Sequence, residues 1–196
     1  MAMKGRFWFK KFPLEVNEAN AYLIACPLVR EAMLVDAGEY PAGLEALLAQ
    51  HGFRLRFLFL THGHGDHVAG AEEVRERHGA EILMSRADSR LCGLAPDRFV
   101  EHGERIPLGQ GEGVVLETPG HTPGSLSLHI GEYVFVGDAL FAGAVGGTAS
   151  PEEFARQVEA IRRHLFTLPD STIVCPGHGP CTTIGVERVF NGFFVE

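Results

Sequence analysis

The sequence predicts an α/β fold made of two halves, in each of which strands alternate with helices. Apolar runs of strand length recur along the chain and are separated by turns rich in glycine and proline. Segments with helical periodicity lie between these runs, and the alternation is about symmetric around residue 110. Because 196 residues suit one domain with a sizeable core, we expect residues 1–196 to form a single domain whose pseudo-symmetric halves meet near residue 110.

In the first half, short apolar runs predict strands, and apolar residues spaced along one face predict helices. Strands are expected over residues 7–12, 19–25, 32–36, 55–60 and 82–84. Pro41 is expected to open a helix that ends at Gly52. A second helix should begin near Asp66 and stop at Gly79, and a weak third helix should cover residues 86–93.

The second half has shorter elements separated by tighter turns. Strands are expected over residues 114–117, 126–130, 133–136 and 172–175. In the second of these, apolar and polar residues alternate, so His129 is expected to face solvent. Ser150, Pro151 and Glu153 form a capping box that opens a long amphipathic helix. A short helix is expected over residues 183–190.

Composition narrows the class of protein. Apolar residues make up 45% of the chain and charged residues 21%, which is typical of a globular protein. The formal net charge of −8 repels phosphate backbones and argues against a nucleic-acid partner. No apolar run reaches membrane-spanning length, and Lys10 and Lys11 interrupt the N-terminal apolar stretch too early for a signal peptide. We therefore expect a cytoplasmic protein away from membranes, with its oligomeric state open.

The four cysteines form no C-x-x-C pair. They are Cys26, Cys92, Cys175 and Cys181. In a cytoplasmic protein we expect them to be free thiols with a structural role.

The segment from Thr61 to His67 carries the strongest chemical signal. Three histidines and one aspartate fall within six residues, directly after a predicted buried strand. The intervening glycines, Gly63 and Gly65, allow the backbone to coil tightly. Three histidines and an aspartate at this spacing serve no packing purpose, so a metal site is favoured over a plain surface loop. Imidazole and carboxylate ligands suit zinc, iron or manganese.

Three later residues share this setting, a polar side chain at the end of a strand beside glycine or proline. They are His121, Asp138 and His178. Each is a weak signal alone, but together they mark strand ends, where α/β sheets place their sites. Asp36, also at a strand end, is about equally well explained as an aspartate that orients a ligating histidine or as an acidic turn former. The other five histidines lack this setting.

The complete series of these residues resembles the ligand series of the metallo-β-lactamase superfamily. Within that superfamily, residues 118–125, 137–141 and 176–180 look like the glyoxalase II group, and residues 182–188 resemble its short bacterial hydroxyacylglutathione hydrolase-like members. The resemblance covers residues 20–194. It implies a four-layer αβ/βα sandwich, in which two mixed β-sheets face each other and helices cover both outer faces.

The resemblance also implies a site with two divalent metal ions, zinc in first place and iron or manganese as alternatives. One ion would be held by His62, His64 and His121. The second ion would be held by Asp66, His67 and His178. Asp138 would bridge the two ions, and Asp36 matches the family's supporting aspartate. True β-lactamases carry a different residue at the Asp138 position, which argues against that activity.

The implied function is hydrolysis of a small-molecule thioester by a metal-bound hydroxide, with Asp66 orienting the attacking water. The first alternative is an oxygenase similar to the persulfide dioxygenases, which bind one iron through residues matching His62, His121 and Asp138. The second alternative is a non-catalytic metal-binding protein, against which the complete ligand set argues.

Recognition of a glutathione substrate is expected to be weak. The segment over residues 141–150 contains no cation, whereas glyoxalase II relatives place a Lys or Arg there, and no lysine follows Lys11. We also expect the chain to lack the helical C-terminal domain of the larger enzymes. Arg188 is the nearest candidate in the sequence for a substitute cation, although an ordinary exposed helix arginine is the favoured explanation.

Overall fold

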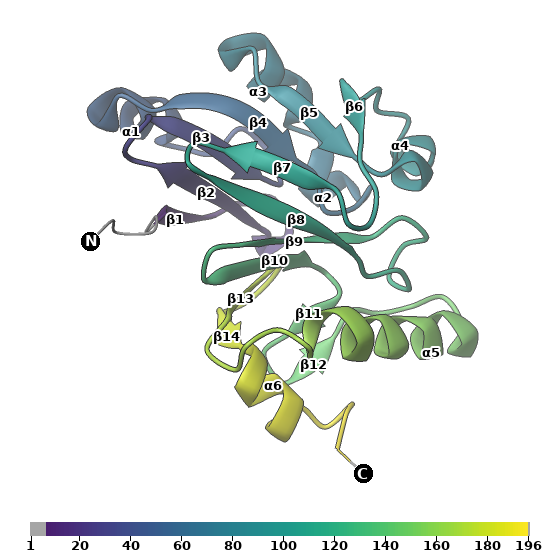
Figure 1. Ribbon diagram of the computed structural model, residues 1–196. Helices are drawn as coiled ribbons and strands as arrows, with labels where there is room; N and C mark the ends of the chain where they lie inside the picture. The colour runs from purple at the N-terminus through teal and green to yellow at the C-terminus, as the bar shows by residue number, and fades with distance from the viewer. Residues whose placement is uncertain (1–6, 196) are drawn as a thin grey trace.

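The structure is a computed structural model that describes residues 7–195. Two six-stranded β-sheets lie face to face, and helices cover the outer face of each sheet (Figure 1). This arrangement confirms the predicted αβ/βα sandwich. Residues 1–6, which include the start of the N-terminal basic and aromatic stretch, lie outside the described residues.

The first sheet holds six strands in the order of the sequence. They are β1 (Trp8–Pro13), β2 (Asn20–Cys26), β3 (Glu31–Val35), β4 (Arg54–Phe59), β5 (Glu81–Met84) and β6 (Arg98–Phe99). The first three strands pair antiparallel, while β3 to β6 run parallel to one another. The parallel part has helical crossovers, so the carboxyl ends of its strands lie along one edge.

Helices α1 (Leu44–His51), α3 (Ala71–His78) and α4 (Arg86–Cys92) belong to this first half. The prediction that Pro41 opens α1 was wrong, because the helix begins at Leu44, whose N–H donates to the Pro41 carbonyl across a turn. The helix expected from Asp66 is broken into α2 (Gly65–Val68) and α3. The break lies at Gly70, whose N–H donates to the Ala37 carbonyl and which has no room for a side chain against the backbone of Glu39.

The second sheet has the strand order β14-β13-β10-β9-β8-β7. Its strands are β7 (Arg105–Leu108), β8 (Gly111–Glu117), β9 (Leu126–Ile130), β10 (Tyr133–Gly137), β13 (Ile173–Pro176) and β14 (Thr182–Thr183). A separate hairpin, β11 (Leu140–Phe141) with β12 (Ala144–Val145), follows β10. Helix α5 (Pro151–Ala160), a π-helical turn (Ile161–Leu165) and α6 (Ile184–Phe190) complete this half. Ser150 caps α5 as predicted, accepting a bond from the Glu153 N–H at 3.2 Å.

One apolar core lies between the sheets, where side chains from β2 to β5 meet those from β7 to β10 and β13, and another lies under α1 and α3. A further apolar layer lies under α5 and α6 and includes Val134. His129 pairs with Val134 across β9 and β10, so it points into the same layer. It is therefore half-buried, and the prediction that it faces solvent was wrong. Within residues 7–195 no helix is long and apolar enough to span a membrane.

Candidate metal centre

The structure brings all seven predicted ligand residues together at one end of the sandwich. The His62–His67 stretch lies in the loop after β4 and in α2, and His121 lies in the loop between β8 and β9. Asp138 follows β10, and His178 follows β13. Each residue follows a strand end, so the two sheets deliver their polar side chains to one seam between them.

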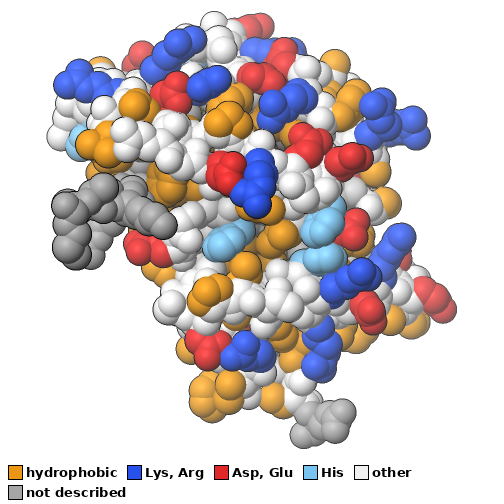
Figure 2. All heavy atoms as spheres, viewed as in Figure 1, with side chains coloured by type: hydrophobic (Ala, Val, Ile, Leu, Met, Phe, Trp, Pro, Cys, Tyr) orange, Lys and Arg blue, Asp and Glu red, His pale blue; other side chains and the backbone are white. Residues whose placement is uncertain are grey.

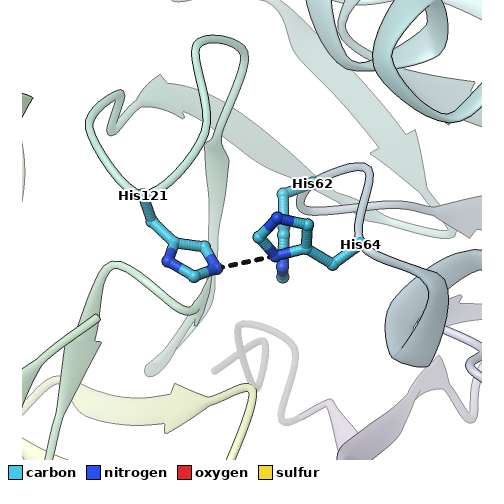
Figure 3. A group of neighbouring side chains, drawn as sticks. All are labelled: His62, His64 and His121. Atoms are coloured by element: carbon cyan, nitrogen blue, oxygen red, sulfur yellow. Dashed lines mark hydrogen bonds between the residues drawn. The ribbon is translucent and has the colours of Figure 1, made fainter. Parts of the chain in front are cut away.

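The first ligand group consists of His62, His64 and His121, whose ligand nitrogens lie within 4.8 Å of one another. Figure 3 shows the three imidazoles pointing toward a common centre, with His121 approaching from a different loop than His62 and His64. The distance from His121 Nε2 to His64 Nδ1 is 2.9 Å. These residues are therefore spaced as three ligands of one ion.

The second ligand group consists of Asp66, His67 and His178, which also meet within 4.8 Å. His178 Nε2 lies 3.3 Å from His67 Nε2 and 3.5 Å from Asp66 Oδ2. The amide of Asn17 donates to Asp66 Oδ2 at 3.1 Å, a contact that no pattern in the sequence predicts.

Asp138 lies between the two groups. Its Oδ2 is 3.4 Å from His121 Nε2 and 4.0 Å from His62 Nε2, both in the first group. In the second group, Oδ2 is 3.5 Å from His178 Nε2, and Oδ1 is 3.5 Å from His67 Nε2. One carboxylate thus faces four imidazole nitrogens, two from each group.

The donor set fits divalent metal ions. Among the described residues, His62 Nε2 and Asp138 Oδ1 are buried without a hydrogen-bond partner, although buried polar atoms are normally satisfied. His62 belongs to the first ligand group, and Asp138 lies between the two groups. His62 and His67 form the closed floor of the site, while His64, Asp66, His121 and His178 are partly exposed at its mouth.

Asp36 is joined to one residue of each group by a short hydrogen-bond chain. Its Oδ1 accepts from the Thr61 N–H, and its Oδ2 accepts from the Thr61 hydroxyl and from His67 Nδ1 at 3.0 Å. The Thr61 oxygen, having donated its proton, accepts from His62 Nδ1 at 3.1 Å. The Nε2 atoms of His62 and His67 then face the centre, which is the orientation that metal-ligating histidines require. Asp36 adopts a left-handed φ of 59°, which is strained for a non-glycine residue.

The charges of the site follow from these contacts. Burial and the nearby His67 hold the pKa of His62 well below its usual value, so it is a neutral imidazole. Burial opposes protonation of His67, but the hydrogen bond and charge of Asp36 raise its pKa to about 9. Burial would raise the pKa of Asp138, yet the hydrogen bond from His178 and the nearby histidines hold it far below its usual range. Asp138 is therefore a carboxylate at neutral pH.

Asp88 is a buried residue of the site that the sequence interpretation missed. Its Oδ2 accepts from the Gly63 N–H at 2.8 Å and from the Thr122 hydroxyl at 2.6 Å, and its Oδ1 accepts from the Gly124 N–H. It thereby joins the loop of His62 and His64 to the loop of His121. The one sequence signal was Ser85, three residues before Asp88, whose hydroxyl caps α4 by accepting from the Asp88 N–H.

Arg188 makes its contacts outside the two ligand groups. Its guanidinium donates to the Phe166 carbonyl at 3.1 Å and pairs with Asp170. A different cation, Lys11, lies beside the His178 loop, where its ammonium donates to the Gly179 carbonyl at 2.6 Å. The distance in sequence between Lys11 and this loop concealed that proximity.

Comparison with known families gives a match over residues 14–178 to the family described as the metallo-beta-lactamase superfamily. The chain is 31% identical to hydroxyacylglutathione hydrolase GloC of Haemophilus influenzae, over 92% of this chain and 97% of that protein. It is 38% identical to a hydroxyacylglutathione hydrolase of Cereibacter sphaeroides, over 83% of this chain and 63% of that longer protein.

Solved structures of similar proteins share the same fold. ETHE1 from Myxococcus xanthus superimposes with a TM-score of 0.82 at 31% identity, covering 94% of this chain and 83% of that one. The protein TTHA1623, solved in a di-iron-bound form, gives a TM-score of 0.77 at 32% identity, covering 94% of this chain and 99% of the other.

Proposed function

Because the chain belongs to the metallo-beta-lactamase superfamily and carries two adjoining ligand groups, we propose that it is a two-metal hydrolase of small acyl thioesters. The observation that carries the proposal is the position of Asp138, within 4.0 Å of imidazole nitrogens from both groups. Two relatives named hydroxyacylglutathione hydrolase, at 31% and 38% identity, support the thioester class.

In this proposal each residue of the site has a separate role in the hydrolysis. The ions, when bound, lower the pKa of water and polarise the substrate carbonyl. Asp138 balances their charge from between the two groups. Asp66 lies at the partly exposed mouth, where it would accept a hydrogen bond from the attacking water. The Asn17 amide donates to Asp66 Oδ2 and orients that carboxylate. A thiolate leaving group needs little protonation, so no separate general acid is required.

The metal content is the first test. We expect two ions per chain in protein reconstituted with excess zinc, iron or manganese, as measured by elemental analysis and by anomalous scattering at both positions. One occupied position under these conditions would contradict the two-metal proposal.

The second candidate function is the mononuclear iron oxygenase. It is favoured by the arrangement of His62, His121 and Asp138 as two imidazoles and one carboxylate, and by the likeness to ETHE1. A single bound iron, with oxygen consumption in the presence of a persulfide, would select this function. Thioester cleavage without oxygen consumption would select the hydrolase.

On the substrate side we propose weak binding of the glutathione part. Arg188 is engaged by Asp170 and the Phe166 carbonyl, and β11–β12 presents Phe141 to His178, with 6.2 Å between the ring centres. Unpaired glutathione carboxylates forfeit charge-assisted bonds of about 1.5–3 kcal/mol each. We expect weak saturation with S-lactoylglutathione and better relative activity on thioesters with a neutral thiol part. A micromolar KM that is lost in Lys11→Gln or Arg188→Ala would contradict this expectation.

A further inference from the structure

Strand register places two of the four cysteines opposite each other. In the antiparallel pair β13–β14, Val174 lies opposite Thr182. The next step of the same register brings Cys175 opposite Cys181. Neighbours on antiparallel strands have Cα atoms about 4.5–5.5 Å apart, which falls within the range of about 4.4–6.8 Å that disulfides span. The sequence interpretation, which considered only C-x-x-C spacing, treated both residues as unrelated thiols.

The two thiols have different surroundings. Cys175 is buried between the sheets, whereas Cys181 is exposed. Residues opposite each other on antiparallel strands point to the same face, so the continued register turns both thiols to one side of the β13–β14 pair. Lys11, which lies opposite Tyr22 in the β1–β2 register, adds a positive charge beside Cys181.

These surroundings give the two thiols different pKa values. The hydrogen bond from Cys175 and the charge of Lys11 lower the pKa of Cys181 to about 6, although burial of its sulfur acts in the opposite direction. Burial raises the pKa of Cys175. At neutral pH, Cys181 is the accessible nucleophilic thiolate and Cys175 is a protected thiol beside it.

We propose that Cys175 and Cys181 are a redox pair that forms a cross-strand disulfide when a hydroperoxide reaches the exposed Cys181. The sulfur of Cys181 attacks the terminal peroxide oxygen, the O–O bond breaks, and an alcohol or water leaves. The resulting sulfenic acid is attacked by the sulfur of Cys175, which forms the S–S bond and expels water. Two thiols thus lose two electrons and two protons, and the hydroperoxide is reduced.

The two cysteines flank a loop that carries one of the candidate metal ligands. Cys175 and Cys181 bracket residues 176–180, the loop that carries His178. In the thiol form, this loop is held by bonds to its backbone, from the Tyr22 hydroxyl to the Pro176 carbonyl at 2.7 Å and from Lys11 to the Gly179 carbonyl. The disulfide closes the two ends of the loop covalently.

The test uses purified full-length protein loaded with zinc, so that no redox-active metal is present. After treatment with hydrogen peroxide we expect the intact mass to fall by two hydrogens, and reduction to restore it. Non-reducing peptide mapping is expected to join the peptides of Cys175 and Cys181. Cys175→Ser should block the cross-link and leave a sulfenic acid on Cys181 that dimedone traps, whereas Cys92→Ser, which removes a half-buried thiol on α4, should leave the cross-link intact.

An intact mass that does not change after peroxide treatment, or a cross-link that joins other cysteines, would overturn the proposal.

A second pair of variants tests whether Cys181 is the attacking thiolate. Lys11→Gln should slow alkylation of Cys181 by iodoacetamide several-fold at neutral pH, while Lys10→Gln, on the opposite face of β1, should leave the rate unchanged. Equal rates in the two variants would overturn the assignment of Cys181 as the attacking thiolate.

Discussion

Asp138 is the residue on which both candidate metal positions depend, because its carboxylate lies within 3.5 Å of imidazole nitrogens from both groups. We expect Asp138→Asn to lower kcat/KM by more than about 100-fold and to reduce the metal content, since an amide cannot supply the charge. His129→Ala, far from the ligand groups, should leave metal content intact and turnover little changed. Thioester assays measure the change in kcat/KM of both variants, and elemental analysis measures their metal content. An Asp138→Asn protein with both ions and near-normal turnover would remove the bridge from the mechanism.

Gly177 is required by the close approach of its backbone to the ligands. A Cβ atom there would overlap Asp138 Oδ1 and lie 2.7 Å from His67 Cε1. Gly177→Ala is therefore expected to displace Asp138, to lose metal, and to lower stability by about 1–3 kcal/mol. Gly65→Ala is the matched control, because Gly65 also lies between candidate ligands but has open space around its Cα. Zinc titration and denaturant unfolding of both variants test the contrast, and equal zinc affinities would contradict it.

At this scale the sequence predicted which polar residues would meet at one place and missed most of the side chains that contact them. Histidines and aspartates beside glycine stand out in one dimension, and the structure brings all seven together. Their ligand role and the supporting role of Asp36 stay predictions. Asp88, Asn17 and Lys11 escaped notice because their meaning depends on contacts with segments distant in sequence.

Among the secondary-structure elements, α4 has a role that its short, weakly patterned sequence hides. Through Asp88 it holds the loop after β4 and the loop before β9 at a fixed separation. Asp88→Asn would replace one accepting oxygen by an NH₂ donor that faces a backbone N–H donor, at a cost of about 1.5–3 kcal/mol, and we expect about tenfold weaker zinc binding. Asp97→Asn is the control, since Asp97 also accepts a backbone N–H, from Ile82, but in a more exposed place. Similar zinc affinity in both variants would refute the role of α4.

The predicted elements were the long ones. Strands β2, β3, β4, β9 and β10 were foreseen because buried apolar residues predominate in each, in a continuous run or in alternation with polar residues. The strands β6, β11, β12 and β14 have two residues each, so they are defined by backbone pairing with a partner and carry no periodicity. Helix α5 was placed correctly, but buried Gln157, which donates to the carbonyls of Ala139 and Gly146 beside Asp138, interrupts the apolar face that the pattern predicted.

For the whole molecule, the ligand groups draw on both sheets, so bound metal is expected to connect them. Four candidate ligands precede residue 110 and three follow it. We expect removal of metal by a chelator to lower Tm, since a ligand at 100 times its Kd contributes about 2.7 kcal/mol to stability. Hydrogen exchange should increase in the ligand loops and stay unchanged in α1. Restoration of Tm by added zinc is the control. An unchanged Tm after chelation would contradict the expectation that bound metal connects the two sheets.

The position of β13 has a consequence for events during synthesis on the ribosome. This strand lies inside its sheet, between β10 and β14, yet it is among the last strands to emerge. The group of His62, His64 and His121 is complete in the nascent chain well before His178 has been translated. Because a domain generally folds as a unit during synthesis, the second sheet cannot be completed before β13 has emerged. If two ions bind as proposed, the second position becomes complete only at this stage, when His178 and β13 emerge together.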